Sequence, residues 1–157
     1  MRSLLALFFV GLAVSFAIAQ EKADIPPNRF QVTYDPGNYP QSTPQEALGS
    51  IIKAIGRERY DYLVAHLLDP AFVDNRLRSA NITPDQLGKD VKAQLLEDPD
   101  LVKSLRRFLD EGEFSAGASQ VTVRLKDVKD KQVYLKKVGT RWFMENRRQE
   151  EKGTEKE

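Results

Sequence analysis

The stretch from Thr43 to Asp74 constrains the fold of this chain most, because it carries clear signals for two consecutive helices. Thr43, Pro44 and Glu46 have the spacing of a capping box: a hydroxyl accepts from the N3 amide, proline takes the first helical position, and a carboxylate reaches back to the cap. Gly56 predicts the end of this helix. Its apolar stripe has helical spacing and consists of Leu48, Ile51, Ile52 and Ile55.

A second helix is predicted after the break at Gly56. Its stripe repeats the same spacing and consists of Tyr60, Leu63, Val64 and Leu67. Asp69-Pro70 ends this helix, because proline disfavours the helical conformation in the residue before it. The two stripes predict a helix pair that packs on one common surface.

The following segments extend the helical region to Gly112. A short helix is predicted over 71–80. Thr83, Pro84 and Gln86 then repeat the capping arrangement and begin a helix that runs to Leu96. Asp98-Pro99 serves as cap and first turn of a further amphipathic helix that ends before Gly112.

Beyond Gly112 the apolar period changes from about 3.6 to 2, which indicates half-buried strands. The alternating apolar residues are Val121, Val123, Leu125, Val133 and Leu135. Gly139-Thr140 forms a tight turn into the strand 141–145, and 113–118 is a candidate edge strand. Helices first and an antiparallel meander last predict an α+β domain, with helices packed on a curved C-terminal sheet.

The N-terminus has the three regions of a secretory signal peptide. Met1-Arg2 precedes an apolar run, and Ala17-Ile18-Ala19 is a small-x-small cleavage site. The alternative is an uncleaved membrane anchor, but an apolar run of about 15 residues is shorter than the ~20 needed to span a bilayer. We therefore expect export to the periplasm or beyond the cell, with cleavage after Ala19.

The predicted organisation is a signal peptide at 1–19, a proline-rich arm at 20–42, an α+β domain at 43–146 and a charged, disordered tail at 147–157. The arm contains three aromatic residues, which predict that it binds a groove of the domain as an irregular strand. These residues are Phe30, Tyr34 and Tyr39.

Composition excludes several classes of function. The chain has no cysteine, which rules out thiol chemistry and disulfides. It has 24 Lys and Arg and 23 Asp and Glu, so removal of Arg2 with the signal peptide leaves the protein neutral. A neutral, exported protein is not expected to bind nucleic acid. One histidine without cysteine predicts no metal site, and no motif indicates a cofactor.

Two segments resemble the nuclear transport factor-like, or ketosteroid isomerase-like, cone fold. They are TPQEALGSIIKAIGRERYDYLVAHL at 43–67 and VYLKKVGTRWFMEN at 133–146. The chain departs from the family between them, where mostly helical sequence replaces a third helix and an early hairpin. The resemblance implies helices on a cone-shaped sheet. It also implies either an enzyme, such as an isomerase, dehydratase or hydrolase, or a binding and dimerisation module.

The candidate catalytic residues lie on the second predicted helix. Tyr62 is four residues before His66 and Asp69 three after, so the three share one side of the helix, at the edge of its stripe. A carboxylate that orients an imidazole makes a general base, and a phenol can donate to an oxyanion. The structural interpretation is that Asp69 ends the helix and that His66 is a partly buried amphipathic side chain.

Four other residues are weaker candidates. Asp61 and Asp74 are possible acids inside a cone, although Asp61 lies opposite much of the stripe and is expected in solvent. Trp142 and Tyr60 are candidate ligand-binding aromatics, although the size and apolar area of Trp142 favour a place in the core.

These observations favour an exported, non-catalytic domain that binds a small-molecule ligand or an envelope protein, with a homodimer as a further expectation. The alternative is a small isomerase, dehydratase or hydrolase with a pocket acid and base.

Overall fold

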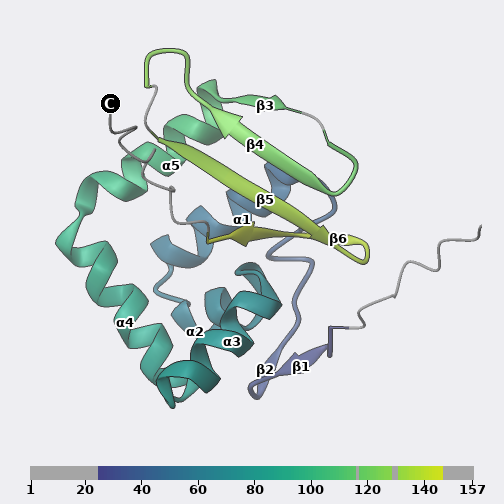
Figure 1. The fold of residues 1–157 in the computed structure, drawn as a ribbon, viewed down its shortest axis with the longest axis vertical. Helices are drawn as coiled ribbons and strands as arrows, with labels where there is room; N and C mark the ends of the chain where they lie inside the picture. The colour runs from purple at the N-terminus through teal and green to yellow at the C-terminus, as the bar shows by residue number, and fades with distance from the viewer. Residues whose placement is uncertain (1–24, 116, 129–130, 147–157) are drawn as a thin grey trace, which may run out of the picture.

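The computed structural model describes residues 25–115, 117–128 and 131–146, so the predicted signal peptide and tail lie outside the described residues. Helices come first and an antiparallel sheet last (Figure 1), which confirms the α+β prediction. The elements are β1 (Asn28–Arg29), β2 (Val32–Thr33), α1 (Pro44–Gly56), α2 (Tyr60–Tyr62), the π-helix η1 (Leu63–Leu67), α3 (Pro70–Ala80), α4 (Pro84–Glu97), α5 (Pro99–Glu111), β3 (Glu113–Ser115), β4 (Gln120–Arg124), β5 (Gln132–Val138) and β6 (Arg141–Glu145).

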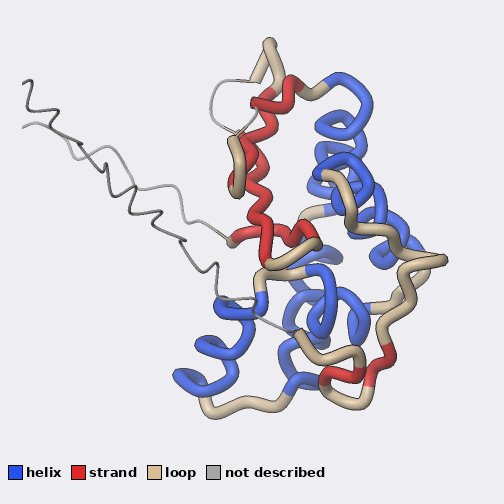
Figure 2. The backbone as a smooth tube through the Cα atoms, turned by 90° about the vertical axis from the view of Figure 1, so that its right-hand side faces the viewer, coloured by secondary structure: helices blue, strands red, loops and turns tan. Residues whose placement is uncertain are grey.

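The C-terminal sheet is an antiparallel meander in the order β3-β4-β5-β6. Leu135 of β5 pairs with Met144 of β6, and Val121 of β4 pairs with Leu135, so apolar residues of three strands share one face. Figure 2 shows α1 and α5 on one side of this sheet. The predicted edge strand forms as β3. The sheet is not strongly curled, so the helix-on-sheet arrangement is confirmed at this coarser level.

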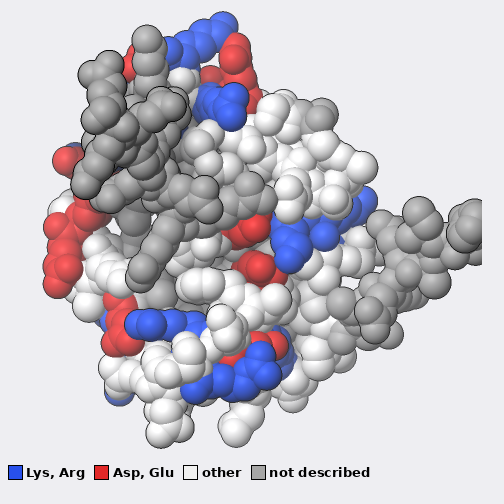
Figure 3. All heavy atoms as spheres, in the orientation of Figure 1, with Lys and Arg blue, Asp and Glu red and all other residues white. Residues whose placement is uncertain are grey.

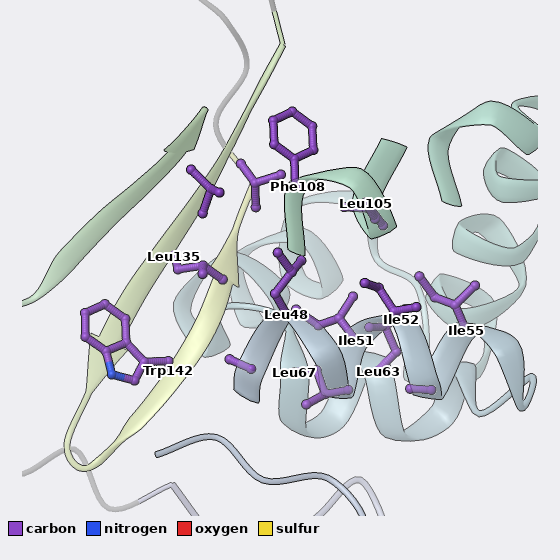
Figure 4. Packing of buried hydrophobic residues seen from close by; sticks show 14 of the residues in the cluster. Leu48, Ile51, Ile52, Ile55, Leu63, Leu67, Leu105, Phe108, Leu135 and Trp142 are labelled. Carbon is purple, nitrogen blue, oxygen red and sulfur yellow. The ribbon is translucent and has the colours of Figure 1, made fainter. Parts of the chain in front are cut away.

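The core lies between α1, α5 and the sheet (Figure 4). Leu48 of α1 and Leu135 of β5 are fully buried, and Phe108 of α5 is 3% exposed. The capping box predicted for α1 is present, since the Thr43 hydroxyl accepts from the Glu46 amide at 3.1 Å and the Glu46 carboxylate accepts from the Thr43 amide at 3.1 Å. The local signals of this helix therefore agree with its place in the core.

The helix ends differ in detail from the predictions. Helix α1 ends at Gly56, but Gly56 is not in the left-handed region; that conformation belongs to Glu58, whose φ is 55°. Thr83 caps α4 by accepting from the Gln86 amide at 3.2 Å. Asp98 takes the N-cap position of α5 and Pro99 its first turn, as predicted, but the Asp98 side chain makes no cap hydrogen bond. None of the described helices is long and apolar enough to cross a membrane.

The second predicted helix starts as α2 and widens into the π-helix η1. The amide of Leu68, just after η1, donates to the carbonyl of Leu63 at 3.0 Å, which is the five-residue spacing of a π-helical hydrogen bond. A π-helical turn holds more residues than an α-helical turn and shifts their angular positions. The segment also packs against α1, α3, α4 and β6, and all five residues of Leu63–Leu67 are buried. His66 is therefore fully buried, and its predicted position at the edge of the stripe was wrong.

The described part of the arm, residues 25–42, packs against the domain. β1 and β2 form a hairpin whose turn residues Phe30 and Gln31 have φ of 55° and 64°, as a type I′ turn requires. The Trp142 amide donates to the Gln41 carbonyl at 2.9 Å, which joins the end of the arm to β6. Tyr39 is buried at 3% exposure.

Candidate functional site

A hollow of about 350 Å³ lies between the arm and the start of α2. Its walls combine aromatic rings with a few polar groups. The lining residues are Thr33, Tyr34, Asp35, Pro36, Tyr39, Arg59 and Tyr62. Five of the seven come from the arm, so the hollow exists only because the arm packs on the domain.

The tyrosines of this hollow are fixed by contacts between arm and helix. The rings of Tyr39 and Tyr62 stack with centroids 4.3 Å apart and an interplanar angle of 29°. The Tyr62 hydroxyl accepts from the Asp35 amide at 3.1 Å. Because both rings are almost wholly buried, they form a rigid floor rather than mobile surface groups.

Two charged groups face the hollow, and each already has a partner. Arg59 donates through Nε and Nη2 to the Asp61 carboxylate, both at 2.9 Å. Asp35 accepts from the side-chain amide of Asn38 at 2.8 Å and from its backbone amide at 3.1 Å. The Asn38 side chain and then its backbone amide hold the pKa of Asp35 below its usual value, and Arg59 does the same for the pKa of Asp61.

Tyr62 is the one predicted catalytic residue that lines the hollow. Burial raises the pKa of its phenol to about 12. The phenol therefore keeps its proton at neutral pH and serves as a hydrogen-bonding group, whereas a proton-transfer group works best with a pKa near the working pH.

His66 does not face the hollow and does not bond to Asp69. Its Nε2 lies 2.7 Å from the Val32 carbonyl, so Nε2 carries the proton and donates, while the buried Nδ1 has no partner among the described residues. Asp69 instead caps α3 by accepting from the Ala71 amide at 3.3 Å, and lies 3.7 Å from the Lys136 ammonium. The carboxylate–imidazole pair that a general base requires is not formed.

The surroundings of His66 keep its imidazole neutral. Burial is the largest cause that lowers its pKa, and the cations Arg141 and Arg29 act in the same direction. The hydrogen bond to Val32 opposes them. The ring packs against aromatic neighbours, with centroids 5.0 Å from Tyr62 and 5.6 Å from Tyr34.

The remaining candidates lie outside the hollow. Trp142 is 6% exposed and belongs to the core, and Tyr60 is half-buried beside Gly88 of α4. Asp61 is exposed as expected, and Asp74 of α3 pairs with Arg29 of β1. The structure brings together no three His, Asp or Glu side chains able to hold a metal ion within the described ranges.

Sequence reasoning missed most of the lining of this hollow. The aromatic residues of the arm predict that Phe30, Tyr34 and Tyr39 bind a groove of the domain, but they do not predict a hollow. Nothing in the local pattern indicates that this turn stands opposite Arg59. Comparison with known protein families, curated proteins and solved structures finds no match to this chain.

Proposed function

We propose that this chain is an exported, non-catalytic binding domain, and that the hollow between the arm and α2 holds a small planar ligand with an acidic or acceptor group. The observation that carries this proposal is the set of three tyrosines around a hollow of about 350 Å³. Export rests on the signal-peptide pattern of residues 1–19.

The size and lining of the hollow support this ligand class. Small-molecule sites have volumes of roughly 300–1,000 Å³ and combine aromatic walls with a few polar groups that fix orientation. Tyr39 and Tyr62 are almost wholly buried and stacked on each other, so an aromatic ligand would contact mainly the half-buried ring of Tyr34. Asp61 occupies Nε and Nη2 of Arg59, which leaves Nη1 to donate to an acceptor on the ligand.

The lining also supports binding over catalysis. Its acidic group Asp35 has a lowered pKa and its phenol Tyr62 a raised one, so neither exchanges a proton near neutral pH. The enzyme alternative draws its acid and base from Tyr62, His66 and Asp69, of which His66 and Asp69 do not line the hollow. A retained ligand, rather than a turnover product, is the expected finding.

Membership of the cone-fold family is part of the same proposal. Helices followed by an antiparallel meander support it, and the family contains many binding and dimerisation modules. The weak curl of the sheet speaks against a closed cone. Described Lys and Arg side chains lie among Asp and Glu on the face in Figure 3, in keeping with a small-molecule or protein partner rather than nucleic acid.

The experiment is binding of benzoate, measured by ligand-observed NMR on the protein lacking residues 1–19, with acetate as the probe that lacks a ring. Three variants test the site. Thr33→Trp fills the hollow from an exposed position, Arg59→Ala removes its cation, and Arg57→Ala is the matched control two residues away.

We expect benzoate to bind and acetate not to, with binding lost in Thr33→Trp and weakened about tenfold in Arg59→Ala. Arg57→Ala should bind as the unmodified protein does. The proposal fails if no benzoate binding is detected, or if Thr33→Trp binds benzoate unchanged. Native mass spectrometry of protein from its host's envelope fraction identifies the natural ligand or protein partner in parallel.

A further inference from the structure

Two side chains attach the hairpin of the arm to the region of η1. Arg29 of β1 donates to the Ala65 carbonyl at 3.3 Å and the Pro70 carbonyl at 3.2 Å, and pairs with Asp74. His66 donates from Nε2 to the Val32 carbonyl of β2 at 2.7 Å. Because five of the seven residues of the hollow belong to the arm, these contacts also hold the hollow together.

If the second ring nitrogen of His66, Nδ1, were protonated, its N–H would find no acceptor among the described residues. Nδ1 is buried and has no partner among the described residues. Two cations act electrostatically on the ring, Arg141 from β6 and Arg29 from β1. The guanidinium of Arg141 stacks over Tyr34, with 4.3 Å from its carbon to the ring centroid.

Asp69 and Asp74 of the same region have other partners than the imidazole. Asp69 bonds to the Ala71 amide and lies near Lys136, and Asp74 pairs with Arg29. The titratable groups whose rings touch His66 are the phenols of Tyr34 and Tyr62. A protonated His66 would therefore be a buried positive charge that two arginines repel, with an N–H that lacks an acceptor among the described residues.

We propose that His66 is an acid-sensitive latch: the neutral imidazole holds the arm on η1, and protonation at Nδ1 releases the arm and opens the hollow. The opening of the arm follows from the contacts of His66 alone. Release of a ligand by this opening rests on the proposed function.

The direction of the pH dependence follows from proton linkage. In the open arm the imidazole is solvated and takes its ordinary pKa of about 6.5, whereas in the closed arm burial lowers this pKa. The open state therefore binds more protons. The closed arm has its full stability above about pH 6.5 and loses it as the pH falls toward the lower pKa, with up to a tenfold rise in the open population per pH unit.

The test is hydrogen exchange of two arm amides at pH 7.5 and pH 5.5, normalised to intrinsic rates and to amides of β5. The Asp35 amide bonds to the Tyr62 hydroxyl of α2 at 3.1 Å, so its exchange reports detachment of the arm from the domain. The Tyr34 amide bonds to the Pro27 carbonyl at 2.7 Å within the arm, so its exchange reports whether the hairpin itself stays formed. We expect the protection of the Asp35 amide to fall at pH 5.5, by at most about tenfold. His66→Gln keeps a donor for Val32 without titrating, and its arm protection should not change with pH.

A second measurement needs no variant at the buried position. His66 is the only histidine, so the imidazole signals in the NMR spectrum belong to it without assignment. Its pKa should lie below 6.5 and arm exchange should increase over the same pH range. Arg141→Met removes one neighbouring cation, so the pKa of His66 should rise and the acid-driven opening should weaken.

The latch is refuted if arm protection is independent of pH, or if His66 titrates at or above its ordinary pKa while the arm stays closed. Equal acid opening in His66→Gln and the unmodified protein also refutes it.

Benzoate binding at both pH values separates the two proposals. Acid opening without benzoate binding at pH 7.5 refutes the function and leaves the latch; benzoate binding with a pH-independent arm refutes the latch and leaves the function.

Discussion

Gln41 is a buried amide whose substitution tests how the arm, η1 and β6 are joined. Both N–H groups of its Nε2 are used, one on the His66 carbonyl and one on the Trp142 carbonyl, each at 2.8 Å. The side chain is 1% exposed, and its own Oε1 is buried without a hydrogen-bond partner in the described structure. Gln41→Met removes both hydrogen bonds and keeps nearly the same volume.

The expected loss follows from the groups left behind. Each buried carbonyl without a donor costs about 1–3 kcal/mol, so two cost about 4 kcal/mol. Removing the unpartnered Oε1 recovers about 2 kcal/mol of desolvation. The free energy of unfolding should therefore fall by about 2 kcal/mol in Gln41→Met. Gln41→Ala adds a cavity and should lose about 1–2 kcal/mol more.

The measurement is equilibrium unfolding in urea, monitored by circular dichroism, on the chain without residues 1–19. With an m-value of about 1.5–2 kcal/mol/M, a loss of about 2 kcal/mol moves the midpoint down by about 1 M at unchanged m. A loss below about 0.5 kcal/mol in Gln41→Met would refute the reasoning, because it would mean that the two carbonyls find other donors or that the contacts do not form.

Two further predictions concern stability. Gly112→Ala should lower the free energy of unfolding by about 1–3 kcal/mol, because a Cβ there would collide with the Phe108 carbonyl and with Val123 Cγ1. In the control Gly56→Ala the new Cβ meets nothing within 4 Å, so this variant should be as stable as the unmodified protein or more stable. Equal effects of the two substitutions in urea unfolding would contradict this prediction. Between about pH 10 and 12 the unfolded chain releases the proton of Tyr62 and the folded chain keeps it, so stability should fall as pH rises, by up to about 2.7 kcal/mol. Tyr62→Phe should lack this component, and a parallel alkaline decline in both proteins would exclude it.

Local signals predicted the elements whose hydrogen bonds and apolar stripe lie within one helix or one hairpin. The capping box of Thr43 and Glu46 formed as its spacing indicates. The alternation from Val121 to Leu125 also formed, because side chains on a strand point to opposite faces whatever lies around them. Capping and strand alternation depend only on residues a few positions apart in the chain, so the sequence is enough to predict them.

The arrangement expected for Tyr62, His66 and Asp69 differs from the structure, because tertiary contacts and a π-helical turn replace the regular α-helical spacing. The spacing of Tyr62, His66 and Asp69 places them on one side of a regular α-helix. The π-helical turn at Leu63–Leu67 breaks that spacing, the arm residues Val32 and Tyr34 contact the buried His66, and Asp69 caps α3. A wide turn has no strong signature in residue type, so periodicity could not indicate it.

The sequence by itself determined the helix starts, the strand alternation, the absence of cysteine chemistry and the balance of charge. Only the tertiary structure decided which groups meet: His66 bonds to a carbonyl 34 residues away and Gln41 to one 25 residues away. Such contacts form when the arm closes over the domain and excludes water from their polar groups, and no window of neighbouring residues contains both partners. The hollow, its tyrosine floor and the proposed latch all depend on that closure.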